Sequence, residues 1–296
     1  MKPIIRWTTY KDRPAVTVET NKAVALFLPE DGGKLASLQA KSDHWEFLTQ
    51  TDNEAYRVLA YDGSYIDAEC SACDEMFPTI DPCMPSPNFG EYPDHGEVCR
   101  MAHSVQIDEQ GINIGVASKQ LHYTYTKRIT CDDTGALILE YTIENPTDHP
   151  FPNLWAMHCM LRGDASAELL LPYEEDASVE MMFGPENAEQ LPRNRLLPYQ
   201  PGGATYKFYY LEPMSKGMCG CIYHANGHKF LLEFDAGKIP YLGVWLNSGG
   251  FKDMYNLALE PCTAPFDTPD RAEVRGCGST LQPCEKLQFS VRIIVE

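Results

Sequence analysis

The chain has 296 residues, of which 44% are hydrophobic and 22% are charged, as in globular proteins with a large apolar core. The 42 acidic residues outnumber the 24 lysines and arginines, so the formal net charge is −18. Proteins that bind nucleic acids or anionic membranes need basic surfaces to neutralise phosphates. The charge therefore predicts no nucleic-acid partner and no membrane partner, and it weighs against a strongly anionic substrate.

Targeting signals and cysteine usage indicate the compartment. The segment from Met1 to Pro14 has no apolar core of signal-peptide length, and the chain contains no run of about 20 apolar residues. The eleven cysteines are an odd number, scattered from Cys70 to Cys284, which is not the pattern of a disulfide framework. We therefore expect a cytoplasmic protein with reduced, buried thiols.

Signals for short strands dominate the chain. Residues Ala15–Val18 and Ala23–Leu28 are β-rich runs on either side of a turn-like segment. Residues Leu121–Ile129 begin with alternating side chains and lead to the turn sequence Asp-Asp-Thr-Gly. Because Leu137–Ile143 follows at once, the two runs predict a hairpin. The last strong strand is Leu287–Val295.

Long amphipathic helical patterns are scarce. The best candidate is Ala188–Leu197, which Pro192 interrupts. The 22 prolines and 21 glycines punctuate nearly every gap, as expected when many short strands need many turns. With no internal repeat and no linker, the sequence predicts an all-β fold, one large antiparallel β-sandwich that spans residues 1–296 as a single domain.

The densest irregular stretch runs from Asp62 to His95 and contains five prolines. A loop of this length without periodicity is usually either functional or disordered. This one contains the aromatic residues Phe77, Phe89 and Tyr92. Such side chains favour an ordered loop that packs over a site.

Three segments carry polar side chains of the types used in catalysis. They are Pro93–Arg100, which reads Pro-Asp-His-Gly-Glu-Val-Cys-Arg; Glu144–Thr147 followed by Asn153–His158; and Tyr241–Trp245 followed by Leu257–Pro261. In this order and at these spacings they resemble the aldose 1-epimerase, or galactose mutarotase-like, superfamily, nearest its hexose-phosphate mutarotase-like branch. Asp74–Pro78 is similar to the family's proline-containing segment, and Leu28–Leu35 is similar to its early glycine turn. One departure is Cys159-Met160, where the family commonly has an aromatic pair.

The resemblance implies a galactose mutarotase-like supersandwich that acts on a small-molecule sugar. Interconverting anomers requires a base that removes the C1 hydroxyl proton and an acid that protonates the ring oxygen, after which the C1–C2 bond rotates and the steps reverse. This chemistry involves no redox change and requires no cofactor. By resemblance, Glu260 is the base and His158 the acid, since reference pKa values of about 4.3 and 6.5 allow opposite protonation states near neutrality. The expected substrate-binding residues are His95, Arg100, Asp74 and Trp245.

Each of these residues also has a structural interpretation. A glutamate before a proline, such as Glu260, is often a solvated turn acid at a strand end. A histidine in an apolar segment, such as His158, is commonly a satisfied core side chain. Arg100 fits equally well as an ion-pair partner in so acidic a protein. Trp155 and Trp245 are residue types that stack on sugars, but they also occur as buried strand residues.

The cysteines and histidines include residue types that bind zinc. They form the patterns Cys70-x-x-Cys73, Cys219-x-Cys221 and His224-x-x-x-His228. The Asn226-Gly227 pair predicts a hairpin turn, which would place the two histidines on opposite strands. We therefore expect no metal site.

Two functions from different classes remain open. The first is a cofactor-independent aldose 1-epimerase, and the second is a non-catalytic carbohydrate-binding β-sandwich; another carbohydrate-active enzyme on the same fold is a weaker third. The pair of Glu260 and His158 favours the epimerase, because a binding protein needs no matched acid and base. The acid-rich residues 62–97 favour a neutral hexose over its 6-phosphate, since phosphate recognition needs donors such as Arg57 and Arg100.

Overall fold

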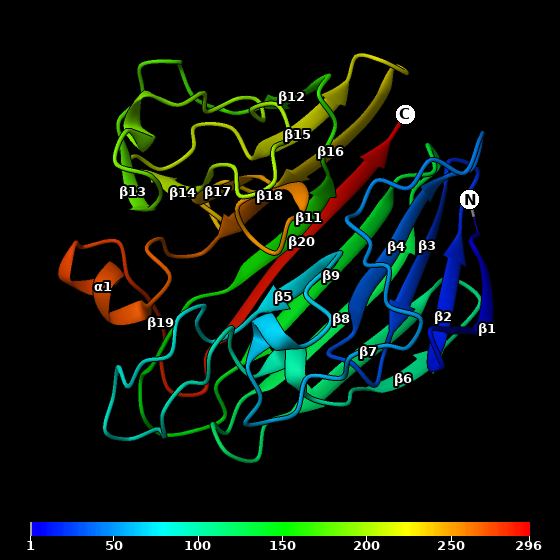
Figure 1. The fold of residues 1–296 in the computed structure, drawn as a ribbon. Helices are drawn as coiled ribbons and strands as arrows, with labels where there is room; N and C mark the ends of the chain where they lie inside the picture. Colours follow the sequence, from blue (N-terminus) through cyan, green and yellow to red (C-terminus); the bar gives the residue numbers. More distant parts are fainter. Residues whose placement is uncertain (1) are drawn as a thin grey trace.

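The computed structural model describes residues 2–296. Within these residues the strands form a ten-stranded sheet, an eight-stranded sheet and a small two-stranded sheet, and every strand pair is antiparallel. The two large sheets pack face to face, with turns and long loops around their edges (Figure 1). The predicted all-β architecture, a large antiparallel β-sandwich, is confirmed.

The order of strands within each sheet differs from their order in the chain. The ten-stranded sheet runs β1 (Ile4–Tyr10), β2 (Arg13–Glu19), β3 (Ala23–Leu28), β4 (Lys34–Ala40), β5 (Cys73–Met76), β11 (Ala156–Arg162), β18 (Tyr255–Cys262), β17 (Tyr241–Ser248), β14 (Thr205–Tyr210) and β13 (Val179–Phe183). The eight-stranded sheet runs β12 (Ala167–Leu170), β15 (Met218–Tyr223), β16 (His228–Phe234), β20 (Lys286–Val295), β9 (Leu137–Glu144), β8 (Thr124–Cys131), β7 (Ile112–Ala117) and β6 (Ser104–Ile107). The small sheet pairs β10 (Phe151–Asn153) with β19 (Ser279–Leu281).

The strands expected from the sequence are present. The run Ala15–Val18 lies within β2, Ala23–Leu28 is β3, and the two strands pair. The predicted hairpin forms between β8 and β9, with Ile129 opposite Leu139. The terminal run Leu287–Val295 lies within β20, which pairs with β9 and β16.

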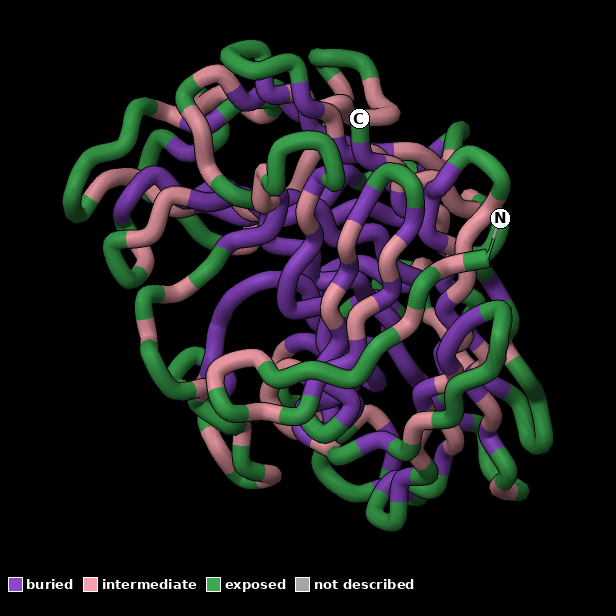
Figure 2. Tube along the Cα trace, turned by 90° about the vertical axis from the view of Figure 1, so that its right-hand side faces the viewer, coloured by how far each residue is buried: buried purple, intermediate pink, exposed green. Residues whose placement is uncertain are grey.

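The main core lies between the two large sheets. Along β9, the alternate residues Leu137, Leu139, Tyr141 and Ile143 are buried, as period-two side-chain geometry requires for a strand with one covered face. They contact side chains of the ten-stranded sheet such as Leu259, which belongs to the same core cluster. Figure 2 shows buried segments gathered at the centre and exposed segments at the turns.

The helical prediction was largely wrong. Of residues Ala188–Leu197, only η3 (Ala188–Gln190) is helical, and it is a single 3₁₀ turn. Pro192 explains this, because proline lacks the N–H that an α-helix needs and disfavours helical geometry in the residue before it. A short helix, α1 (Pro269–Val274), was not expected; Thr268 caps it by accepting a hydrogen bond from the Arg271 amide. Among residues 2–296, no helix is both long and apolar enough to span a membrane.

The long irregular stretch is anchored in the core. Phe77, Phe89 and Tyr92 are buried, and all three rings pack against Phe151. The loop is therefore ordered, as predicted, but these rings fasten it to the interior instead of forming its cover over a site. The stretch also contains η1 (Tyr65–Asp67) and β5, and it leads to η2 (Val98–Arg100).

Candidate active site

The predicted acid–base pair lies on the outer face of the ten-stranded sheet, meaning the face turned away from the eight-stranded sheet. Along β11, Met157 and Cys159 belong to the core between the sheets, so the intervening His158 points to the outer face. Glu260 comes from the adjacent strand β18, and its Oε1 lies 3.6 Å from His158 Nε2. Both side chains are buried. The structure thus brings together two residues separated by about a hundred positions in the chain.

A buried lysine joins this pair. The Nζ atom of Lys207, on β14, lies 2.7 Å from Glu260 Oε2 and 2.8 Å from Asp267 Oδ1. The hydroxyl of Tyr209 donates a hydrogen bond of 2.7 Å to the same Asp267 oxygen. Each of these four side chains is buried. The site is therefore built around one ammonium group shared by two carboxylates.

A cavity of about 170 Å³ opens onto these groups. Its lining residues are Ile80, Asp81, His95, His158, Met182, Phe183, Lys207, Trp245, Asp267 and Arg271. Glu260 lies behind this lining, in contact with Lys207 and His158, and it is fully buried. A larger cavity of about 790 Å³ lies elsewhere, where Arg57 and Arg162 are among its lining residues, but no histidine lines it.

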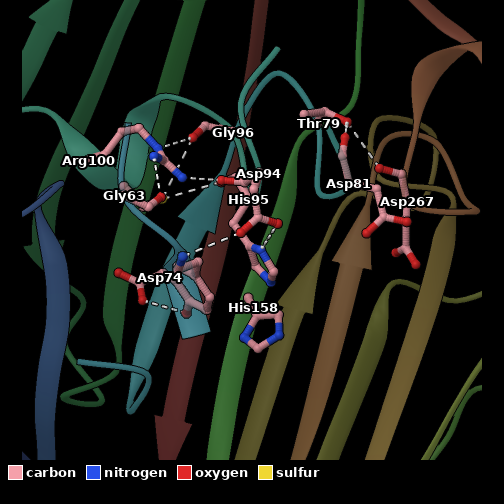
Figure 3. Close-up of polar contacts among 12 residues, drawn as sticks. Gly63, Asp74, Thr79, Asp81, Asp94, His95, Gly96, Arg100, His158 and Asp267 are labelled. Carbon is pink, nitrogen blue, oxygen red and sulfur yellow. Dashed lines mark hydrogen bonds and ion pairs between the residues drawn. The ribbon is translucent and has the colours of Figure 1, made fainter. Parts of the chain in front are cut away.

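The irregular stretch supplies His95 to the cavity. His95 has a φ of 58°, and its Nδ1 atom lies 2.8 Å from Asp94 Oδ1. Its ring stacks on Tyr65 with a centroid separation of 4.0 Å, and it lies 6.0 Å from the ring of His158. Figure 3 shows the His95 and His158 rings next to each other. Gly96 is required next to it, because a Cβ atom there would lie 2.5 Å from the Phe77 carbonyl oxygen.

Arg100 does not line the cavity. Its Nε donates to the carbonyl of Gly96 at 2.9 Å, and its Nη atoms donate to the carbonyls of Ala60, Tyr61, Gly63 and Asp94. These contacts join the two ends of the irregular stretch, as Figure 3 shows. The structure therefore places the guanidinium behind His95, where it fixes the backbone of the loop.

Asp74 and Trp245 occupy different places. Asp74 lies directly opposite His158 in the β5–β11 pairing, but its Oδ2 accepts hydrogen bonds from Lys34 at 2.7 Å and from the Tyr65 hydroxyl at 2.9 Å. It therefore supports the Tyr65 ring that stacks on His95. Trp245 lines the cavity, and its indole N–H has no hydrogen-bond partner among residues 2–296.

Burial and neighbouring charges set the protonation states. Burial lowers the pKa of His158 to about 4, against the opposing effect of Glu260, so the imidazole is neutral at neutral pH. Burial opposes ionisation of Asp267, but Lys207 outweighs it and lowers the pKa of that carboxyl group. Burial also opposes the charge on Lys207, yet Asp267 and Glu260 together raise the pKa of the ammonium group. Asp267 and Lys207 are therefore both ionised in this site.

Comparison with known proteins places the fold. No protein-family model and no curated protein matches the sequence. Among solved structures, a galactose mutarotase-like protein from Lactobacillus casei has a TM-score of 0.67 and 16% identity, with 95% of this chain and 100% of that chain covered. A galactose mutarotase-like protein from Clostridium acetobutylicum has a TM-score of 0.67 and 13% identity, with coverage of 100% and 99%. The Slr1438 protein from Synechocystis sp. PCC 6803 has a TM-score of 0.68 and 13% identity, with coverage of 99% and 96%.

The chain has the galactose mutarotase-like fold. The resemblance found in the sequence is confirmed at this level. At identities of 13–16% the likeness concerns the fold, and the roles of individual residues rest on the geometry of the site.

The sequence did not indicate two members of this candidate site, Lys207 and Asp267. Lys207 had a usable signal, since it is the one charged residue in the strand sequence Thr-Tyr-Lys-Phe-Tyr-Tyr. A lone lysine among buried aromatic residues requires a buried anionic partner. Asp267 lies in an irregular segment after β18 and has a φ of 66°, and no pattern in the sequence pointed to it.

The candidate zinc ligands are dispersed. β15 ends at Tyr223 and β16 begins at His228, so the predicted turn between the two histidines is confirmed. The Nε2 atom of His224 contacts Glu168, and that of His228 contacts Asp43. Within residues 2–296 the cysteines form no disulfide bond. Within the part of the chain that the structure describes, no three ligand-type side chains converge.

Proposed function

We propose that this protein is a cofactor-independent aldose 1-epimerase that interconverts sugar anomers in the cytoplasm. Glu260 removes the proton from the C1 hydroxyl, and His158 donates a hydrogen bond and then a proton to the ring oxygen. His95 and Trp245 bind sugar hydroxyls at the mouth of the cavity. Arg100 and Asp74 act indirectly, by orienting His95. Arg100 fixes the backbone of the loop, and Asp74 fixes the Tyr65 ring that stacks on His95.

The observation that carries this proposal is the contact between His158, which lines the cavity, and Glu260, which lies directly behind the lining. Their separation of 3.6 Å allows one sugar carbon to present its hydroxyl and ring oxygen to the two groups together. Neither Glu260 oxygen accepts a well-directed hydrogen bond within residues 2–296, although Lys207 lies at ion-pair distance, and His158 Nδ1 also lacks a partner. Buried polar atoms without partners are costly, so these atoms favour a role toward a ligand.

The mutarotase-like fold of the solved neighbours agrees with this reaction class. The neutral state of His158 defines how it acts, because a neutral imidazole donates through its N–H and passes the proton on only as the ring oxygen gains negative charge. A non-catalytic sugar-binding protein is the alternative. It would bind sugars in the same cavity and would not need a buried carboxylate beside a histidine.

Saturation-exchange NMR between anomers tests the proposal, with a panel of hexoses and their 6-phosphates as substrates. We expect exchange with at least one sugar, and we expect Glu260→Gln to lower the rate by about 10²- to 10⁴-fold while the fold is retained. Glu75→Gln is the matched control, because Glu75 is also buried and paired with a lysine, Lys127, but lies outside the cavity. Equal rates in the wild type and a folded Glu260→Gln variant would refute the assignment of the base.

A further inference from the structure

The ammonium group of Lys207 stands between the proposed base and the cavity. Lys207 lines the cavity, whereas Glu260 lies behind it at 2.7 Å. Asp267 holds the same nitrogen atom from the other side at 2.8 Å, and its own position is fixed by the Tyr209 hydroxyl. An ammonium group has three N–H bonds, and one of them donates to Asp267, while Glu260 Oε2 lies at ion-pair distance without accepting a directed hydrogen bond. At least one N–H bond is therefore left for the cavity.

This arrangement is unusual for a purely structural ion pair. A second buried lysine in the chain, Lys127, donates to both oxygens of Glu75 and to the Gly33 carbonyl, which uses all its donors inside the core. Lys207 donates one hydrogen bond, to Asp267, forms an ion pair with Glu260 and lines the cavity. Its charge is maintained by its carboxylate neighbours, so a cation faces any sugar carbon that reaches Glu260.

We propose that Lys207 is a third catalytic residue, whose ammonium group binds the anomeric oxygen and stabilises the negative charge that develops there when Glu260 removes its proton. The inference rests on the function proposed above and deepens it. Asp267 and Tyr209 are positioning residues, because they hold Nζ without touching the substrate.

The step conserves protons and electrons. Glu260 takes the proton of the C1 hydroxyl, and the oxygen keeps the electron pair while Lys207 stabilises it. That pair then forms the C1–O1 double bond as the C1–O5 bond breaks, and O5 takes a proton from His158. After rotation about C1–C2, O5 attacks C1 from the opposite face, its proton returns to His158, and Glu260 returns its proton to O1. No group is consumed.

A preorganised donor of this kind acts where charge develops, in a site from which water is excluded. Removing one such donor typically lowers the rate constant by about 10²- to 10³-fold. A structural ammonium group would have another signature. Its loss would reduce the amount of folded protein and leave kcat per folded molecule unchanged.

The experiment compares anomer exchange in Lys207→Met, Lys207→Ala and the wild type, with rates expressed per folded molecule. We expect Lys207→Met to lose at least about 100-fold in kcat, with a smaller change in KM. Adding methylammonium or ethylammonium to Lys207→Ala should restore part of kcat. Lys127→Ala is the matched control, because it also removes a buried lysine, and it should show neither loss of kcat nor rescue by amines.

The outcomes separate the two proposals. If the wild type exchanges no sugar of the panel, the proposed function fails and the role of Lys207 fails with it. If the wild type is active but Lys207→Met keeps its kcat, only the role of Lys207 is overturned. Should the single variants not fold, the double variant Lys207→Met/Asp267→Asn removes the unpaired Asp267 charge and is measured in their place. A near-normal kcat in that double variant overturns the inference, and a loss of about 100-fold supports it.

Discussion

Gly243 lies directly opposite Glu260 in the pairing of β17 with β18, and opposite Tyr209 in the pairing of β17 with β14. A Cβ atom at this position would lie 3.3 Å from Glu260 Oε2 and 2.8 Å from Tyr209 Cε1. Strand β17 lies between Lys207 on β14 and Glu260 on β18. At Gly243, where the contact between the two side chains passes over β17, this strand has no side chain. This gap allows Lys207 to reach Glu260 from two strands away.

Replacing Gly243 by alanine should therefore disturb the site directly. The added methyl group must displace the buried Tyr209 ring, whose hydroxyl holds Asp267, and crowd the oxygen that contacts Lys207. We expect Gly243→Ala to lower the anomer-exchange rate by about tenfold or more, in line with the cost of misplacing catalytic groups by about an ångström. Exchange NMR and thermal melting measure the effect. Gly90→Ala is the control, since a Cβ there meets only Leu121 Cδ2 at 3.9 Å.

The second prediction concerns the coupling of the acid and the base. Glu260 and His158 are in contact and act on one transition state, so their substitutions should not be additive. We expect His158→Ala to slow ring opening, and the double variant with Glu260→Gln to be little slower than the slower single variant. A double variant that shows the product of the two separate losses would contradict a concerted role. Circular dichroism of all three variants controls for unfolding.

The sequence predicted the architecture well because strand periodicity is a local property. The hairpin of β8 and β9 follows from alternation and one turn, and both are visible in about 20 residues. The candidate site was predicted less completely. Glu260 and His158 were found through their order in the chain, but the order does not show that β14 lies two strands from β18.

The order of strands within the sheet explains why the sequence did not indicate Lys207 and Asp267 as members of the site. Lys207 reaches Glu260 because β17 and β14 follow β18 in the sheet, and Asp267 enters from an irregular segment. These are long-range relationships that no local pattern encodes. The same limit applies to Arg100, whose residue type suggested a contact with substrate. Its surroundings, five backbone carbonyl groups, depend on how a loop of some 40 residues folds back on itself.

Stability should fall in mildly acidic solution because of buried histidines. Burial, aided by the charge of Lys127, lowers the pKa of His103 to about 3, whereas an unfolded histidine has a pKa of about 6.5. As the pH falls, His103 is therefore protonated in the unfolded chain before it is protonated in the folded protein. The contribution of His103 to stability is fully present above about pH 6.5 and is lost as the pH falls from there toward about 3.

The variant His103→Gln should lack this dependence. Relative to the wild type, its free energy of unfolding should improve by at most about 1.4 kcal/mol for each unit of pH below about 6.5. Urea unfolding at several pH values between 4 and 7.5 measures the difference, and the difference cancels titrations shared by both proteins. The exposed His149, changed to Gln, provides the control. If the free energies of unfolding of the wild type and His103→Gln changed with pH in parallel, His103 would not be the source of the loss of stability in acid.

The last prediction concerns the charge of the substrate, and it favours a neutral hexose over a hexose 6-phosphate. A phosphate dianion needs lysine or arginine donors that are not already neutralised. In the cavity, Lys207 is shared by two carboxylates, and Arg271 lies 3.9 Å from Asp81. The other two candidates are elsewhere: Arg100 is bound to backbone carbonyls, and Arg57 lines a separate cavity.

Neutral sugars suit the same surroundings, because their hydroxyls donate hydrogen bonds to carboxylates such as Asp81, which lines the cavity. We therefore expect kcat/KM for glucose or galactose to exceed that for the corresponding 6-phosphate. Steady-state comparison of the four sugars measures the ratio, and repeating it at higher ionic strength separates long-range repulsion by the net charge from contacts within the cavity. A 6-phosphate preferred by more than about tenfold, which corresponds to about 1.4 kcal/mol of transition-state binding, would show that a cation in or near the cavity recognises phosphate after all. Arg271→Gln would then identify it, since Arg271 is the exposed cation at the cavity and the one most easily turned toward a ligand.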